Sequence, residues 1–264
     1  MTQPMRKRQA VQGTVAIGLV IAAASARMAR TRPLAAATLL AGAAALGSAA
    51  YLPRSPLLGP ALSRGPADVP RVAITFDDGP GPSTPAILDH LGEAGARATF
   101  FVLGREVGGH GRTVRRIVEE GHQLASHGWD HGILIFRGPH HVADQLRRTE
   151  RAVAEVAGEG ALTRLFRAPH GFRGPGTALG ARAAGYRMAA WTHGVFDSAE
   201  PGPAVIARRA ERALSPGAVL LLHDGDGWSP GRARPQTVAA LPEVLRSIRA
   251  RGLEAVGMDE LLAG

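Results

Sequence analysis

Two histidines four residues apart are the feature of this sequence that most directly predicts chemistry. This spacing places His127 and His131 on one face of a helical turn, where both imidazoles could bind one divalent metal ion. Two adjacent carboxylates, Asp77 and Asp78, precede a Gly-Pro turn, so both could approach such a site. One could complete a three-ligand metal centre while the other acts as a base. Taken singly, the motifs would also fit surface histidines and a solvated turn.

Three further residues have side chains that would support hydrolysis. His223 follows an apolar run, 219–222, so it should emerge from a buried strand and could act as a general acid that protonates a leaving amine. Asp197 could orient this imidazole and keep it charged. Arg167 is expected to pair with a carboxylate, and Asp77 is the obvious candidate. A core histidine and a surface arginine are the ordinary alternatives.

Several other polar residues lie near these positions in the sequence. Asp224 and Asp226 follow His223 and could shape a substrate groove, although solvated loop acids are the simpler interpretation. No role follows for three further histidines, His140, His141 and His193.

The composition restricts the kinds of site and partner. The chain of 264 residues contains no cysteine, so any metal must be held by histidine and carboxylate. The net charge is +9, but residues 1–70 carry +7 of it and residues 71–264 only +2. The basic excess therefore indicates membrane topology of the N-terminal segment rather than nucleic-acid binding. We expect a monomer with no nucleic-acid partner.

Residues 1–52 form a basic and apolar N-terminal segment. Its apolar runs are 10–26 and 34–52, and the second approaches the roughly 20 residues that span a bilayer. Two membrane helices, one anchor helix and a cleaved signal peptide (with Met28 as the true start) all fit, and a buried Ala-rich helix is the simple alternative. The first three place the catalytic region outside the cytoplasm, anchored to the cell membrane or secreted. Residues 53–70, rich in proline, are expected to be a linker.

Short β-prone runs alternate with helical patterns over a domain expected to cover residues 71–264. The predicted strands are 72–76, 98–103, 123–126, 165–167, 187–191, 218–222 and 253–256. The clear predicted helices are 84–93, 113–120, 142–156, 203–214 and 237–251. Alternating strands and helices imply an α/β fold with a parallel sheet, either open or closed. We favour a distorted (β/α) barrel of about seven parallel strands, because the polar motifs follow predicted strands and C-terminal strand ends converge on one face of a barrel.

Five short motifs, in this order, resemble those of the polysaccharide deacetylase family, also called carbohydrate esterase family four or the NodB homology domain. The resemblance covers about residues 70–260. The motifs are Thr-Phe-Asp-Asp-Gly at 75–79, His-Gly-Trp-Asp-His at 127–131, Arg-Ala-Pro-His-Gly at 167–171, a partial fourth motif that keeps Asp197, and Leu-Leu-His at 221–223. Their joint occurrence is far more specific than any one motif.

The resemblance implies a role for each matching residue. Asp77 would be the catalytic base, and Arg167 would steady it. His223, oriented by Asp197, would be the general acid. The backbone N–H of His170 would help to stabilise the oxyanion.

The resemblance also implies the metal and the reaction. The ligands would be Asp78, His127 and His131, and the metal would be zinc, with cobalt or another divalent ion able to use the same ligands. The expected reaction removes N-acetyl groups from an N-acetylglucosamine-containing polysaccharide, such as peptidoglycan or a chitin-like glycan, and releases acetate. O-deacetylation of acetylated xylan or an exopolysaccharide would use the same residues. A membrane-anchored glycan-binding pseudoenzyme is the non-enzymatic alternative.

Two motifs depart from the family pattern. Gly128 stands where the second motif has Ser or Thr, so a hydrogen bond behind the metal ligands is expected to be lost. In the fourth motif, Gly194 and Ser198 replace an aspartate and a tryptophan. These changes leave the shape of the acetyl and sugar pocket, and hence the substrate, open.

Overall fold

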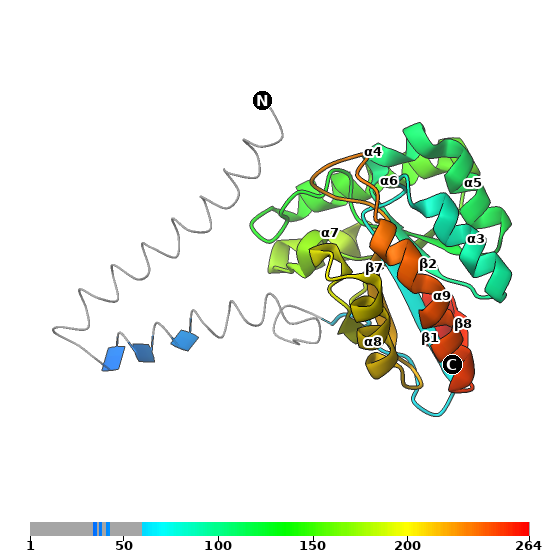
Figure 1. Ribbon diagram of the computed structural model, residues 1–264. Helices are drawn as coiled ribbons and strands as arrows, with labels where there is room; N and C mark the ends of the chain where they lie inside the picture. The colour runs from blue at the N-terminus through cyan, green and yellow to red at the C-terminus, as the bar shows by residue number, and fades with distance from the viewer. Residues whose placement is uncertain (1–33, 36, 39–40, 43–59, 264) are drawn as a thin grey trace.

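The computed structural model describes residues 34–35, 37–38, 41–42 and 60–263 (Figure 1). Most of the expected N-terminal segment, 1–52, and the first part of the expected linker therefore lie outside the described residues, and the membrane and signal-peptide predictions lie there too. Within the described part of the chain, no helix is both long enough and apolar enough to cross a membrane.

Eight short strands, all parallel, form a single sheet whose strand order is β5-β4-β3-β2-β1-β7-β6. The strands are β1 Arg71–Asp77, β2 Thr99–Val102, β3 Gln123–Ser126, β4 Leu162–Phe166, β5 Arg187–Met188, β6 His193–Gly194, β7 Val219–His223 and β8 Glu254–Val256. Off this path, β8 pairs with the first half of β1, beside the place where β2 pairs with the second half. The predicted parallel α/β sheet is confirmed.

The sheet curls until one short segment of chain contacts both of its edges. Residues 187–194 contain β5, which pairs with β4, and β6, which pairs with β7. The sequence prediction of one continuous strand over 187–191 is therefore wrong, because the segment changes partners halfway along. Between the two pairings, the backbone of this segment forms hydrogen bonds with Leu62. The Leu62 N–H donates to Met188 O, and the Leu62 carbonyl accepts from Ala190 N–H.

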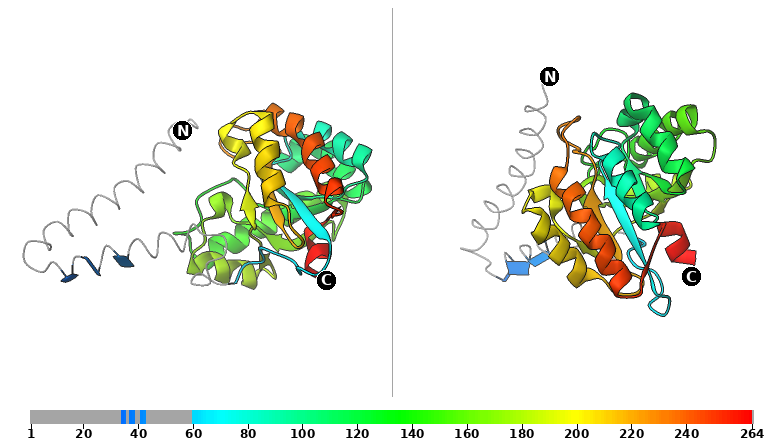
Figure 2. Two further views of the ribbon diagram at one scale, coloured as in Figure 1. Left: turned by 60° about the horizontal axis from the view of Figure 1, so that its bottom comes forward. Right: turned by 45° about the vertical axis from the view of Figure 1, so that its right-hand side comes forward.

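Helices pack on the outer face of the curled sheet, except α10, which packs against the inner side (Figures 1 and 2). They are α3 Thr84–Ala94, α4 Gly104–Val107, α5 Gly111–Glu119, α6 Pro139–Ala157, α7 Pro175–Ala183, α8 Pro203–Ala213, α9 Pro235–Ala250 and α10 Met258–Ala263. Four of them, α6 to α9, begin with proline, whose fixed φ suits the first helical position and whose missing N–H is not needed there. All five predicted helices are present; α4, α7 and α10 were not predicted.

The alternation of side chains along β1 separates the hydrophobic core from the site. Val72, Ile74 and Phe76 belong to the large core under the helices. Ala73 points the other way and packs with residues of α10 in a smaller inner cluster. Because successive strand residues face opposite sides, Asp77 shares the inner side with Ala73. The strand therefore delivers a carboxylate to the inside of the sheet at its C-terminal end.

Candidate active site

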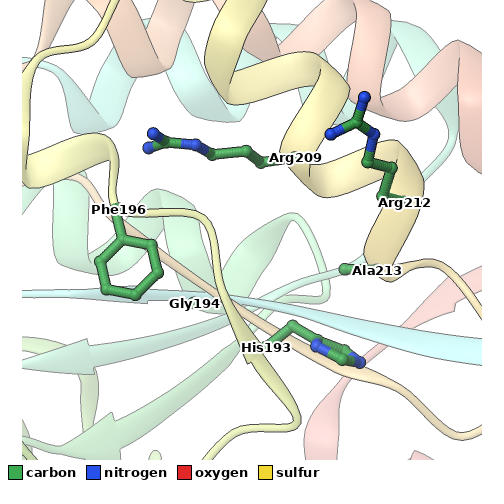
Figure 3. Close-up of a pocket in the computed structure, with 6 residues that line it drawn as sticks. All are labelled: His193, Gly194, Phe196, Arg209, Arg212 and Ala213. Atoms are coloured by element: carbon green, nitrogen blue, oxygen red, sulfur yellow. The ribbon is translucent and has the colours of Figure 1, made fainter.

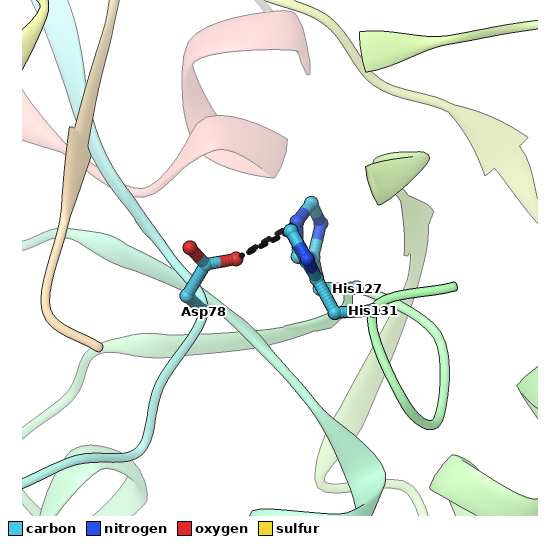
Figure 4. A group of neighbouring side chains, drawn as sticks. All are labelled: Asp78, His127 and His131. Atoms are coloured by element: carbon cyan, nitrogen blue, oxygen red, sulfur yellow. Dashed lines mark ion pairs between the residues drawn. The ribbon is translucent and has the colours of Figure 1, made fainter. Parts of the chain in front are cut away.

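Three buried side chains bring potential metal-binding atoms together at the C-terminal ends of β1 and β3. One ligand atom each from Asp78, His127 and His131 lies within 4.8 Å of the others (Figure 4). Asp78 Oδ1 is 2.9 Å from Nε2 of His131 and 3.3 Å from Nε2 of His127. The structure thus brings together the three residues that the sequence predicted as ligands.

Unusual backbone conformations allow these side chains to converge. Asp78 and His131 both have positive φ, 76° and 58°, so the chain turns sharply at each residue. Gly79 follows Asp78 and lies so close to the carboxylate of Asp224 that a Cβ would collide with it. Gly227 likewise brings the β7–α9 loop against the ring of His131.

The hydrogen bond of the His127 ring makes this cluster suited to a metal ion. Its Nδ1 lies 2.8 Å from the carbonyl oxygen of Arg167, which can only accept, so Nδ1 carries the proton and Nε2 turns a lone pair toward Asp78. Burial alone would raise the pKa of Asp78, but the charge of His131 leads the effects that outweigh burial and hold the pKa well below its usual range. A carboxylate facing an imidazole lone pair calls for a cation between them, so the residues present fit a divalent metal.

The motif loop between the two histidines is fastened from α6. Gly128 has φ 82°, a conformation that suits glycine, and its carbonyl accepts from Thr149 Oγ1 at 2.9 Å. Trp129 N–H donates to Gln145 Oε1 at 2.6 Å. The loop therefore has anchors of its own although the Ser or Thr of the family pattern is absent.

Asp77 lies beside the group of Asp78, His127 and His131, which is called the metal cluster from here on, and it is held by a fully buried arginine. One guanidinium nitrogen of Arg167 donates to Asp77 Oδ1 at 2.6 Å and to Thr75 Oγ1 at 2.8 Å. The other terminal nitrogen donates to Ala190 O, and the guanidinium stacks 3.9 Å from the ring centroid of Phe101. Asp77 Oδ2 remains 3.8 Å from Nε2 of His127. The predicted pairing of Arg167 with Asp77 is present.

A second buried carboxylate orients His223 at the end of β7. Asp197 Oδ1 accepts from Nδ1 of His223 at 2.8 Å, and Oδ2 accepts from the His223 backbone N–H and from Thr237 Oγ1, both at 2.8 Å. Burial opposes the charged imidazolium, but Asp197 more than offsets this effect and raises the pKa of His223 to about 9. Because β1 and β7 are paired with Asp77 opposite His223, the two candidate acid–base groups are neighbours.

His170 lies beside the metal cluster in a conformation with φ 61°. Its ring centroid is 4.3 Å from that of His131. Burial, with His131 and His127 nearby, lowers the pKa of His170 to about 3, so the ring is neutral at neutral pH. The backbone N–H role for His170 stays a prediction.

Two acids after His223 are not the solvated loop residues that the sequence suggested. Asp224 is completely buried and accepts from Thr84 Oγ1 at 2.6 Å, and burial raises its pKa to about 7. Asp226 is also buried; its Oδ1 accepts from two backbone N–H groups of the β7–α9 loop. That interpretation was wrong because two acids beside glycines look the same in sequence whether a loop is open or folded inward.

Sequence reasoning also missed an aromatic neighbour of the cluster. The ring of Trp228 lies 4.9 Å from that of His170 and 5.7 Å from that of His131. Ser198, in the partial fourth motif, is exposed instead. A tryptophan followed by Ser-Pro in a loop carries no sequence signal of such a position; only the fold brings it to the site.

A curled parallel sheet with a buried polar cluster at the C-terminal ends of its strands is the arrangement of an α/β enzyme. Residues 64–189 match the family model described as polysaccharide deacetylase. The chain is 36% identical over 199 residues to the chitooligosaccharide deacetylase of Bradyrhizobium sp. (strain ANU 289), covering 72% of this chain and 90% of that protein. It therefore belongs to the polysaccharide deacetylase family, carbohydrate esterase family four.

Two further comparisons concern peptidoglycan enzymes. A peptidoglycan-N-acetylglucosamine deacetylase of Bacillus cereus is 33% identical over 198 residues, which cover 72% of this chain and 87% of that protein. The crystal structure of the Bc1960 peptidoglycan N-acetylglucosamine deacetylase, in complex with a substituted benzamide, superposes with a TM-score of 0.70 at 28% identity, covering 76% of this chain and 92% of that one.

Proposed function

We propose that this protein is a metal-dependent deacetylase that removes acetyl groups from N-acetylglucosamine units of a polysaccharide. The observation that carries the proposal is the side-by-side placement of the Asp78, His127 and His131 cluster, the Arg167-held Asp77 and the Asp197-held His223. A divalent metal bound by the cluster would polarise the acetamide carbonyl and lower the pKa of a bound water. Zinc is the proposed metal, since two imidazoles and one carboxylate suit it.

The chain's own residues supply the proton transfers. Asp77, fixed by Arg167, takes the proton of the attacking water through Oδ2, the oxygen that faces the cluster. His223 carries a proton at neutral pH, because its pKa is about 9, and delivers it from Nε2 to the departing nitrogen while Nδ1 stays bound to Asp197. The products are acetate and a free amino sugar.

The alternatives are separated by two observations. O-deacetylation would use the same residues, so the choice of N-deacetylation rests on the relatives. The two named relatives are N-acetylglucosamine or chitooligosaccharide deacetylases. A glycan-binding pseudoenzyme is disfavoured because the base, the three metal ligands and the acid are all present.

Acetate release from N-acetylglucosamine oligomers, peptidoglycan and acetylated xylan tests the proposal. We expect the full chain with zinc to release acetate from the first two, and a chelator to stop it. Asp77→Asn should lower kcat by about 100-fold or more. The matched control is Asp89→Asn, an exposed carboxylate that pairs with Arg116 on the surface and should leave the rate unchanged. Metal binding without acetate release from any of the three substrates would falsify the proposal.

We further propose that the catalytic region acts outside the cytoplasm, tethered by or released from the N-terminal segment. The basic and apolar layout of residues 1–52 supports this, as does the peptidoglycan named for relatives. Protease treatment of intact cells should digest the catalytic region. Protection until the cells are lysed would contradict the proposal.

A further inference from the structure

Arg105, on the short helix α4, joins two loops beside the metal cluster with its guanidinium group. One terminal nitrogen donates to the carbonyl oxygen of Asp130, and the other donates to the carbonyl oxygen of Gly227, both at 2.9 Å. Its Nε donates to Glu106 Oε1 at 2.7 Å. Each of the three nitrogens has an acceptor within the protein, so the geometry of this arginine suits fastening rather than substrate binding.

The first of these loops carries the His131 ligand. Asp130 immediately precedes His131, and the backbone N–H of Arg105 donates to the carbonyl oxygen of Trp129 at 3.1 Å. The backbone and the side chain of one residue thus hold two consecutive carbonyl groups just before the ligand. His131 itself has φ 58°, so the chain turns sharply where this fastening ends.

The second loop packs against the ring of the same ligand. A Cβ on Gly227 would collide with Cγ and Nδ1 of His131, so the Gly227 backbone lies against that edge of the imidazole. The rings of Trp228 and His170 meet the His131 ring edge to face, with centroids 5.7 Å and 4.3 Å away. The position of the His131 ring therefore depends on where this loop lies.

The two histidines of the metal cluster are oriented by different means. Nδ1 of His127 is hydrogen-bonded to the carbonyl oxygen of Arg167, which is the usual way to fix a metal-binding imidazole. Nδ1 of His131 is buried, and it has no hydrogen-bond partner among the residues that the structure describes. Packing against the Gly227 loop takes the place of that hydrogen bond.

We propose that Arg105 is a positioning residue for His131 and thereby sets the affinity of the metal cluster for its divalent ion. The inference rests on the metal binding of the proposed function and adds a residue outside the cluster. The sign of the effect separates positioning from charge. A nearby cation repels a divalent metal, so losing the charge of Arg105 alone would tighten metal binding, whereas losing its hydrogen bonds weakens it.

Zinc titration of the metal-free full chain against a chromophoric chelator measures this effect. We expect Arg105→Gln to raise the zinc Kd by about 10-fold or more, because glutamine is too short to reach both carbonyl groups. Arg105→Lys keeps the charge and can donate to one carbonyl, so it should cause a smaller rise. Gly227→Ala should also raise the Kd, because the added Cβ displaces the His131 ring directly.

The matched control is Arg212→Gln, which makes the same change of charge at an exposed arginine of α8. Arg212 lines a separate pocket of about 350 Å³ together with Phe196 and Arg209 (Figure 3). Because solvent and salt screen an exposed charge, the control should change the zinc Kd by less than about twofold. Circular dichroism of the metal-free chains checks that each variant is folded, and Arg105→Lys carries the test if Arg105→Gln is not.

The outcomes separate failure of this inference from failure of the proposed function. A wild-type chain that binds no zinc overturns the proposed metal dependence itself. If the wild type binds zinc and the Arg105 variants bind it equally well or more tightly, Arg105 does not position the ligand. If Gly227→Ala binds zinc as the wild type does, the loop does not set the position of the His131 ring, and the inference is wrong.

Discussion

At the scale of single residues, Asp77 and Asp197 show how the partner of a buried carboxylate decides its use. Asp77 is paired with an arginine, whose charge is permanent, so it remains an anion that can accept a proton. Asp197 is paired with a histidine, whose charge can change, so the pair holds a proton that can be released. In the proposed reaction, the first ion pair would therefore accept a proton and the second would donate one.

The buried pair of Arg167 and Asp77 should dominate the stability of the site. Arg167→Ala leaves the Asp77 carboxylate buried without its cation, so we expect the free energy of unfolding to fall by about 3–5 kcal/mol. Arg164, on the strand that precedes Arg167, pairs with Glu150 at the surface, and Arg164→Ala should change the free energy of unfolding by less than about 1 kcal/mol. Urea unfolding monitored by circular dichroism measures both. Equal small effects would show that Asp77 is neutral or hydrated.

The pair of His223 and Asp197 should make kcat depend on pH, and one substitution in the pair should shift that dependence. General-acid action requires a protonated His223, so kcat should fall as the pH rises through about 9. In Asp197→Asn the anion that raises the pKa of His223 is gone, and this alkaline limb should move down by more than one pH unit. Pre-steady-state rates at saturating substrate give the limb. An unmoved limb in the variant would assign it to another group.

The same pair makes a matching prediction for stability. The pKa of His223 is raised above 6.5, so its contribution is complete below about pH 6.5 and is lost as the pH rises through about 9. The pKa of Asp197 is lowered below 3.8 because His223 outweighs the effect of burial, so its contribution is complete above about pH 3.8 and is lost at more acidic pH. The difference in unfolding free energy between the wild type and Asp197→Asn should therefore be largest between these two limits.

At the scale of elements, the side chain of Arg234 holds the loop between β7 and α9 in place. Its Nε donates to Gly225 O at 2.7 Å, and one terminal nitrogen is 3.2 Å from Asp226 Oδ2. The backbone N–H of Arg234 donates to Ser83 Oγ, so the same residue also ties the loop to the start of α3. This fastening sets where Trp228 lies against the metal cluster.

Arg234→Ala should reduce activity although Arg234 belongs to no catalytic pair. Loosening the loop would displace Trp228 and the Gly227 contact with His131, and a displacement of about 1 Å at a site lowers rates by up to about 100-fold. Amide exchange across 224–233 should become faster in the variant. Arg246→Ala, an exposed arginine of α9 that pairs with Glu243 on the surface, is the control and should leave both readouts unchanged. Normal exchange with lost activity would instead give Arg234 a direct part in the chemistry.

The sequence predicted those features of the fold and site that depend on residues close together in the chain. Strand-end motifs predicted a site with His127, His131 and one carboxylate of Asp77 and Asp78, and they predicted the two ion pairs, because polar residues after apolar runs mark the C-terminal edge of a parallel sheet. The choice of Asp78 as the ligand came from the family resemblance. The change of partners inside 187–194 could not be predicted, since pairing depends on residues far away in the chain. Burial of Asp224 was missed for the same reason: its surroundings come from Gly79 and Thr84.

At the scale of the whole molecule, the start of the described domain completes the curled sheet. Leu62 bridges to Ala189 and Arg64 bridges to Ala218, so this stretch runs between the segment 187–194 and the beginning of β7. Gly65 N–H donates to Gly217 O, and a Cβ on Gly65 would collide with Leu261 of α10. These contacts lie within residues that composition alone marks as a proline-rich linker.

Truncation should expose the contribution of this stretch to stability. A chain that starts at residue 67 lacks three backbone hydrogen bonds made by Leu62 and Gly65 that a chain starting at residue 60 retains. At about 1 kcal/mol each, their loss should lower the free energy of unfolding by about 3 kcal/mol and Tm by roughly 6–12 °C. Leu62→Ala in the longer chain, which keeps the backbone bonds, should cause a smaller drop. Equal Tm values for the two truncations would mean that the sheet is complete without residues 60–66. Calorimetry on both chains, without substrate, measures the two Tm values. Both chains keep every residue of the metal cluster, so a difference in Tm reports on residues 60–66 alone.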